Sequence, residues 1–85
     1  MVLFPNPVTT TNLNVRIENT SGLFYEYALF DAVGKLLLTG KIPVTLPTQT
    51  FEIGMKNVAA GVYFLRLADE HGKTIVKKKI LKQNQ

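Results

Sequence analysis

Residues 57–67 read Asn57-Val58-Ala59-Ala60-Gly61-Val62-Tyr63-Phe64-Leu65-Arg66-Leu67, and they contain the clearest structural signal in the chain. From Tyr63 onward, large apolar residues stand at every second position (Tyr63, Leu65 and Leu67), which is the period of a β-strand. Gly61 lies just before this run, where a tight corner often needs a positive φ. A Leu or Val, two spacers, Gly, one residue and Tyr is the pattern of a tyrosine corner in a Greek-key sandwich, whose Tyr hydroxyl bonds to upstream backbone. The stretch therefore predicts a core strand that is entered through a tyrosine corner.

Two segments near the start of the chain carry strand signals of different kinds. Residues 2–8 begin with an apolar run and contain two prolines, which donate no backbone hydrogen bond, so we expect a short strand at a sheet edge. Residues 12–18 alternate strictly and place Leu13, Val15 and Ile17 on one face. This pattern predicts an antiparallel strand with one face in the core and one face in water.

Two motifs of the form Asp-x-x-Gly-Lys, at residues 31–35 and 69–73, predict hairpins. Asp at the first position and Gly three residues later are typical of a type I turn followed by a left-handed residue. The first motif joins predicted strands at 24–31 and 35–40, and the second leads into a last strand at 73–81. Paired hairpins of this kind favour antiparallel strands over parallel units connected by helices.

The segment between the hairpins has a different character. Residues 41–48 contain two prolines and no helical period, so we expect a connection that crosses from one sheet to the other, followed by a short strand at 51–53. No segment carries the apolar stripe of an amphipathic helix. The pattern as a whole predicts an all-β fold, an immunoglobulin-like antiparallel β-sandwich of about seven strands with Greek-key connections.

The composition is that of one small folded domain. The chain has 85 residues, of which 46% are hydrophobic and 19% are charged, and it has no Cys. No apolar run approaches the roughly 20 residues that a membrane-spanning helix needs, so we expect no membrane insertion. The lack of Cys removes disulfides and thiol catalysis. We expect residues 1–85 to form a single domain that was cut from a larger protein.

Side chains suited to catalysis are few and scattered. His71 is the only His and Ser21 the only Ser, and both fall in predicted turns. Glu18, Glu26 and Glu52 fall on the solvent faces of predicted strands, where solvated carboxylates are usual. No set of these residues has the spacing of a catalytic or metal-binding motif. We therefore expect no enzyme activity, no metal and no cofactor.

Basic residues gather in the last predicted strand. The net charge is +4, and five of the ten basic residues are Lys73, Lys77, Lys78, Lys79 and Lys82. This strand has no interleaved aromatic residue to stack on bases and no Arg, so we expect no nucleic acid as partner. Lysines on an edge strand prevent edge-to-edge aggregation. An accessible edge strand can also dock a protein partner by β-augmentation, and both interpretations stay open.

Four features then follow one another in order: Phe4-Pro5-Asn6-Pro7, Leu29-Phe30-Asp31-Ala32-Val33-Gly34-Lys35, Gly61-Val62-Tyr63 and the Lys-rich last strand. With these features, the chain resembles the type A C-terminal sorting domain of the type IX secretion system of Gram-negative bacteria, over about residues 3–82. The resemblance implies a small β-sandwich that serves as the C-terminal secretion signal of a larger secreted protein. It also implies that the cargo passes through the periplasm and crosses the outer membrane. A sortase-like peptidase then usually removes the signal, and the cargo is attached to the cell surface or released into the medium.

The resemblance also implies partners and recognition residues. The partners are the outer-membrane secretion machinery, the sortase-like peptidase and an N-terminal cargo domain in cis. The residues that match the family's motifs are Pro5, Asn6, Pro7, Gly34, Lys35, Gly61, Tyr63, Lys77, Lys78, Lys79 and Lys82. From the residues themselves, we expect Lys73 to Lys82 to be the docking strand, while Gly61 and Tyr63 mainly hold the fold.

A second class of function is an immunoglobulin-like spacer or carbohydrate-binding module of a multidomain surface enzyme. Sugar binding would need aromatic rings on an open face. The candidates are Phe24, Tyr25, Tyr27 and Phe30, and we expect them to pack into the core instead.

Overall fold

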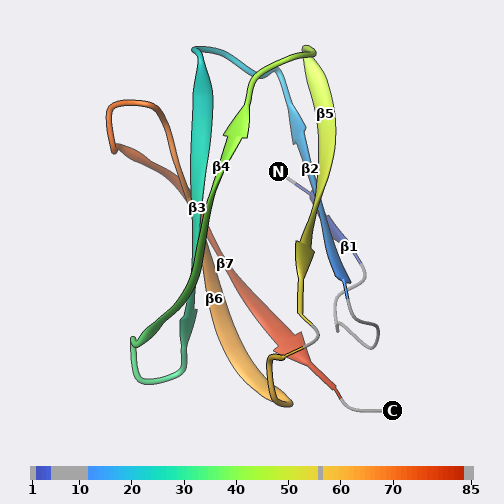
Figure 1. Cartoon of the computed structure of the whole chain (residues 1–85), viewed down its shortest axis with the longest axis vertical. Coiled ribbons are helices and arrows are strands. Elements are labelled where there is room, and N and C mark those ends of the chain that lie inside the picture. Colours follow the sequence, from blue (N-terminus) through green and yellow to red (C-terminus); the bar gives the residue numbers. More distant parts are fainter. Residues whose placement is uncertain (1, 5–11, 56, 84–85) are drawn as a thin grey trace.

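The structure is a computed structural model, and it describes residues 2–4, 12–55 and 57–83. All the regular elements in these ranges are strands (Figure 1). They are β1 (Val2–Phe4), β2 (Asn12–Glu18), β3 (Phe24–Asp31), β4 (Leu36–Pro43), β5 (Thr48–Gly54), β6 (Gly61–Ala68) and β7 (Thr74–Lys82).

The strands form two sheets that face each other (Figure 1). One sheet has the order β1-β2-β5 and the other the order β4-β3-β6-β7, and all neighbouring strands are antiparallel. The chain changes sheet between β2 and β3, between β4 and β5, and again between β5 and β6. The predicted all-β, immunoglobulin-like sandwich with Greek-key connections is confirmed. The edge position expected for the first strand is confirmed for β1, which pairs only with β2.

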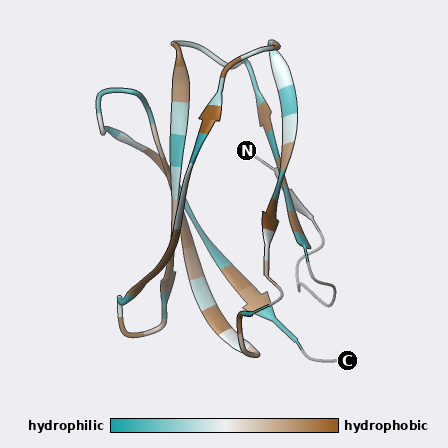
Figure 2. Ribbon diagram, viewed as in Figure 1, coloured by the Kyte–Doolittle hydropathy of each residue, from teal (hydrophilic) through white to brown (hydrophobic). Residues whose placement is uncertain are grey.

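The core fills the space between the two sheets. Leu13, Val15 and Ile17 of β2 are buried, as their alternation predicts. Among the described residues, the buried cluster consists of Leu13, Val15, Ile17, Tyr25, Leu29, Ile42, Ile53, Met55, Tyr63, Leu65, Leu67 and Ile80. Figure 2 shows the alternation directly, as bands of hydrophobic and hydrophilic residues along the strands. Met55, which is fully buried just after β5, has no periodic signal in the sequence that would mark it as core.

The two predicted hairpin turns are confirmed and are built in the same way. In the first, Asp31 Oδ1 accepts the backbone N–H of Val33 at 3.0 Å and that of Lys35 at 2.8 Å. Gly34, whose φ is 91°, donates its N–H to the Asp31 carbonyl. The second hairpin repeats these bonds around Asp69. Local side-chain-to-backbone bonds of this kind explain why a five-residue motif suffices to predict both turns.

The predicted boundaries between the hairpins are wrong. β4 continues to Pro43 and β5 already begins at Thr48, so the crossing connection is residues 44–47 rather than 41–48, and the strand predicted at 51–53 is longer. Pro43 is tolerated because β4 is an edge strand, where one side of the backbone needs no partner. The Gln49 side chain closes the short connection, since its amide oxygen accepts the N–H of Thr45 at 3.0 Å and its amide nitrogen donates to the Pro43 carbonyl at 2.9 Å.

Gly40 in β4 is needed because an aromatic ring occupies the space of a side chain. A Cβ added there would overlap the ring of Tyr27, which pairs with Gly40 across the two strands and stacks on Phe51 at a centroid distance of 5.9 Å. We expect Gly40→Ala to lower the free energy of unfolding by about 1–3 kcal/mol, because the ring must move out of its packed position. Urea unfolding measures this loss. Gly54→Ala is the matched control, since a Cβ at that position meets nothing within 4 Å; equal losses in the two variants would contradict the account.

Candidate recognition surface

The tyrosine corner predicted from the sequence is present at the entrance to β6. The Tyr63 hydroxyl donates to the carbonyl of Ala59 at 2.6 Å, four residues upstream, and the ring is buried. Gly61 has a φ of 156°, a backbone conformation that residues with side chains rarely adopt. Both residues therefore fix the path of the chain from β5 into β6, which agrees with the structural role expected for them.

Tyr63→Phe removes the hydroxyl and keeps the ring. We expect the free energy of unfolding to fall by about 0.5–1.5 kcal/mol, the usual net contribution of one hydrogen bond. Tyr27→Phe is the control, because the Tyr27 hydroxyl has no hydrogen bond within the described residues and this variant should unfold almost like the wild type. Thermal and urea denaturation of both variants measure the two losses in free energy of unfolding. Equal losses would show that the hydroxyl of the tyrosine corner does not stabilise the domain.

The Lys-rich strand β7 forms one edge of the four-stranded sheet. It pairs with β6 alone, from Gly61 opposite Lys82 to Ala68 opposite Thr74. Its second backbone side therefore has no partner strand among the residues that the structure describes. β-Augmentation requires an edge strand.

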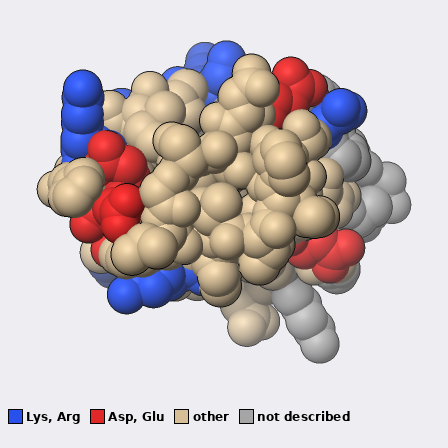
Figure 3. All heavy atoms as spheres, turned by 90° about the horizontal axis from the view of Figure 1, so that it is seen from above, with Lys and Arg blue, Asp and Glu red and all other residues tan. Residues whose placement is uncertain are grey.

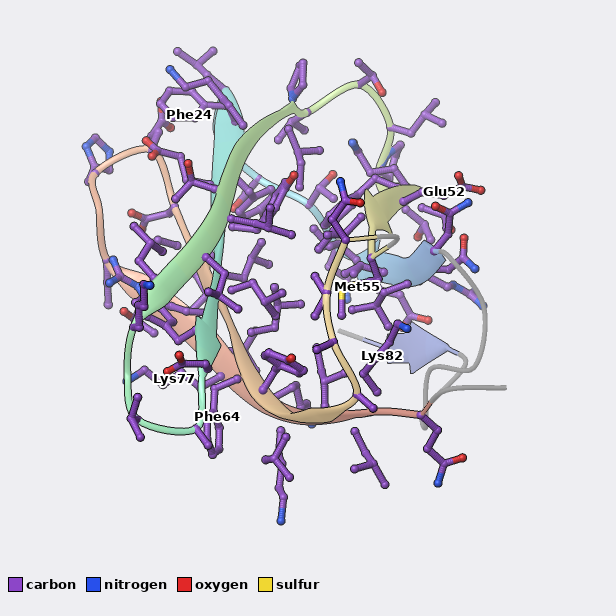
Figure 4. The ribbon with its side chains drawn as sticks, turned by 60° about the horizontal axis from the view of Figure 1, so that its bottom comes forward. Phe24, Glu52, Met55, Phe64, Lys77 and Lys82 are labelled. Carbon is purple, nitrogen blue, oxygen red and sulfur yellow. The ribbon has the colours of Figure 1, made fainter. Side chains whose placement is uncertain are left out.

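The lysines of β7 do not share one environment. Lys77 and Lys79 point to the outer face of the sheet, in register with Arg66 and Phe64 of β6, and both are exposed. Lys78 is also exposed, although it lies opposite the core residue Leu65. Lys82 is only 9% exposed and points from the end of β7 toward the opposite sheet (Figure 4).

Among the residues that the structure describes, the lysines on β7 form no ion pair. The one ion pair in these ranges joins Arg16 and Glu18 on β2 at 3.4 Å, and both side chains are about half-exposed. No described acidic side chain therefore neutralises the positive charges of Lys77, Lys78 and Lys79. Figure 3 views the end of the sandwich opposite the 31–35 hairpin, where the charged side chains lie mainly around the rim of an uncharged surface.

The structure brings several predicted residues together at the end of the sheet where the 31–35 hairpin lies. An open hollow of about 660 Å³ lies between this hairpin and the outer face of β6 and β7. It is lined by Phe30, Asp31, Ala32, Val33, Gly34, Phe64, Leu65, Arg66 and Lys77. A smaller hollow on the other side of the hairpin is lined in part by Gly61 and Tyr63. Figure 4 shows Phe64 and Lys77 next to the hairpin.

The remaining predicted residues lie elsewhere. Lys35 closes the hairpin through its backbone and its side chain is exposed, but it does not line either hollow. Lys78, Lys79 and Lys82 also lie outside both hollows. Pro5, Asn6 and Pro7 lie outside the described residues.

The apolar side chains at this surface were not predicted from the sequence. Val33 is 90% exposed at the hairpin tip and Phe64 is 39% exposed on β6, beside Phe30 on the neighbouring strand. The alternation of β6 does predict that Phe64 lies on the face away from Tyr63 and Leu65. Its neighbours on that face depend on the register of β3, β6 and β7, which cannot be obtained from the sequence.

The four aromatic residues considered for sugar binding do not form one open face. Tyr25 is buried, and its hydroxyl accepts the backbone N–H of Ser21 at 2.9 Å. Tyr27 packs against the core cluster. Phe24 and Phe30 are half-buried on the outer face, and the Lys41 ammonium lies 4.3 Å from the centre of the Phe24 ring. The expectation of core packing is thus confirmed for the two tyrosines and is wrong for the two phenylalanines, because these occupy the outward positions of β3.

The described residues contain no group of three or more His, Cys, Asp or Glu side chains placed to hold a metal ion. They also contain no helix long and apolar enough to cross a membrane. Glu18, Glu26 and Glu52 are exposed on strands, as expected.

Fold and surface together define an immunoglobulin-like β-sandwich module with an accessible, positively charged edge strand. The family model described as "Secretion system C-terminal sorting domain" matches residues 2–83, and the chain belongs to that family. Searches of curated proteins and of solved structures found no match. The domain is a C-terminal sorting signal for type IX secretion, the system that exports proteins of Gram-negative bacteria to the cell surface or beyond it. This supports the secretion-signal prediction and gives no support to the spacer or carbohydrate-binding alternative.

Proposed function

We propose that the folded domain directs an N-terminal cargo domain from the periplasm across the outer membrane, and that it does so by docking β7 on the outer-membrane machinery. The observation that carries this proposal is the position of β7: within the described residues it is an edge strand that pairs with β6, and its exposed lysines have no ion pair with an acidic side chain there. A partner strand that pairs with the outer edge of β7 would extend the sheet by backbone hydrogen bonds.

In this proposal the recognition residues divide by role. Lys77, Lys78 and Lys79 are exposed and contact the partner. Lys82 is largely buried and contributes less contact area than these three. Gly34 and Lys35 shape the hairpin beside the docking strand, and Pro5, Asn6 and Pro7 belong to the segment that follows β1.

Gly61 and Tyr63 act by holding β6, and through β6 they hold β7 in place. A sortase-like peptidase then removes the domain on the N-terminal side, after translocation. In this step the domain serves as the recognition signal, and the peptidase supplies the catalytic groups.

The proposal is tested by fusing residues 1–85 to a reporter with an export signal, in a Gram-negative host that has the type IX system. We expect the reporter to appear at the cell surface or in the medium. A fusion that lacks residues 77–85 should stay in the periplasm. Unimpaired surface delivery of the truncated fusion would refute the docking role of β7. Since the truncation also removes the core residue Ile80, circular dichroism of the purified domain must accompany it.

A further inference from the structure

The hollow beside the 31–35 hairpin combines an apolar floor with a positively charged side. Register places Leu36, Phe30, Phe64 and Lys79 in one row across the outer face of β4, β3, β6 and β7. The next row along contains Ala28, Arg66 and Lys77. Apolar side chains thus lie next to cationic ones on the same face, because residues two apart on a strand point the same way.

The positive charges of this surface exceed the negative ones. Arg66 and Lys77 line the hollow and Lys79 lies beside it, and these three side chains have no ion pair within the described ranges. Asp31 is the acidic residue in the lining, but its Oδ1 already accepts two backbone N–H groups of the hairpin. A ligand that carries a carboxylate would therefore meet cations that have no partner.

We propose that this hollow binds an extended segment of a partner protein that carries a bulky apolar residue and, two positions away, Asp or Glu. Phe64 and Arg66 lie two residues apart on β6, so their spacing matches that of side chains i and i+2 of an extended peptide. The volume of about 660 Å³ is in the range of small ligand sites, and one large side chain fits within it. The inference rests on the proposed docking of β7 and deepens it, because it states the chemistry of the partner.

Two other occupants fit this surface less well. A second copy of the domain would bring two clusters of the same positive charge face to face, which costs free energy. A flat anionic membrane surface would touch the rim of the hollow but would not fill it, whereas a protruding side chain would.

The test is an NMR titration of the ¹⁵N-labelled domain with the peptide acetyl-Thr-Phe-Thr-Glu-Thr-amide. The control peptide has Gln in place of Glu. We expect saturable shifts of the amides of Val33, Gly34, Phe64 and Lys77, with a dissociation constant in the millimolar range for so small a probe. The Gln peptide should bind about threefold more weakly at low salt, because it loses an exposed ion pair.

Variants separate the parts of the site. Replacing both Arg66 and Lys77 with Gln should make the two peptides bind equally, because both cations line the hollow. Phe64→Ser should weaken both by about tenfold, since an apolar contact is lost. Lys73→Gln is the matched control, because Lys73 belongs to the second hairpin, which has the same bonds but does not line the hollow. It should leave both affinities unchanged. Val33→Ser, at the exposed tip, serves as the second variant should Phe64→Ser fail to fold.

Three results would overturn the inference: no saturable shifts, equal affinity of the Glu and Gln peptides for the wild type, or Phe64-dependent binding to phosphatidylglycerol vesicles in place of the peptide. The reporter fusion keeps this failure distinct from failure of the proposed function. If the wild-type and Phe64→Ser fusions are delivered equally well, the hollow has no role in delivery, but the proposed function still stands. Retention of the wild-type fusion in the periplasm would instead count against the proposed function itself.

Discussion

A reporter fusion in which Lys77, Lys78 and Lys79 are all replaced by Glu is expected to fold normally and to lose nearly all surface delivery. The three side chains are exposed, so their replacement leaves the core intact. The change converts three positive charges into three negative ones on the docking strand. An electrostatically complementary partner would then meet like charges, and such a juxtaposition costs several kcal/mol.

The control variant has the same change in net charge, but its three substitutions lie outside β7. Arg16, Lys41 and Lys73 are exposed on β2, on β4 and in the second hairpin, and a fusion with Glu at these three positions has the same net charge. We expect it to be delivered at close to the wild-type level. The measurement is the fraction of reporter that is accessible to protease on intact cells or present in the medium. If the control loses delivery as completely as the β7 variant does, net charge rather than the docking strand decides export.

Replacing Leu65 with Ala is the second change with a large expected effect. Leu65 is fully buried in β6, which lies between β3 and β7. A Leu→Ala change in a core usually lowers the free energy of unfolding by about 2–5 kcal/mol, because it leaves a cavity. A domain of 85 residues has a total of roughly 4–13 kcal/mol, so the loss removes a large part of its stability.

The neighbouring residue supplies the control for this change. Phe64 lies on the outer face and is 39% exposed, so Phe64→Ala should cost much less stability than Leu65→Ala. Urea unfolding of the purified domains measures both. The Leu65→Ala fusion should also be delivered poorly, since β7, the proposed docking strand, is paired with β6. Efficient delivery of a fusion whose domain is shown to be unfolded would contradict the claim that the folded module is the signal.

Features with short-range causes were predictable from the sequence. The hairpins at Asp31 and Asp69 depend on bonds within five residues, and the tyrosine corner joins Tyr63 to a carbonyl four residues upstream. The strict alternation of β2 likewise placed its apolar residues in the core. The edge position of β7 followed from lysines that a central strand would not tolerate.

Features with long-range causes were not predictable. The end of β4 at Pro43 depends on β4 being an edge strand, and the need for Gly40 depends on the Tyr27 ring of another strand. The hollow requires Phe30, Phe64 and Lys77 to be neighbours across three strands. Such pairings are set by sheet order and register, and a single sequence does not specify either one locally.

Photo-crosslinking in cells can show whether the domain docks through β7. A photoreactive amino acid is placed at Lys79 of β7 in one reporter fusion and at Thr39 of β4 in another; both positions are exposed, and both strands are edges of the same sheet. We expect crosslinks to an outer-membrane protein from position 79 and few or none from position 39. Crosslinks from position 39 alone, in fusions that are both delivered, would contradict docking through β7.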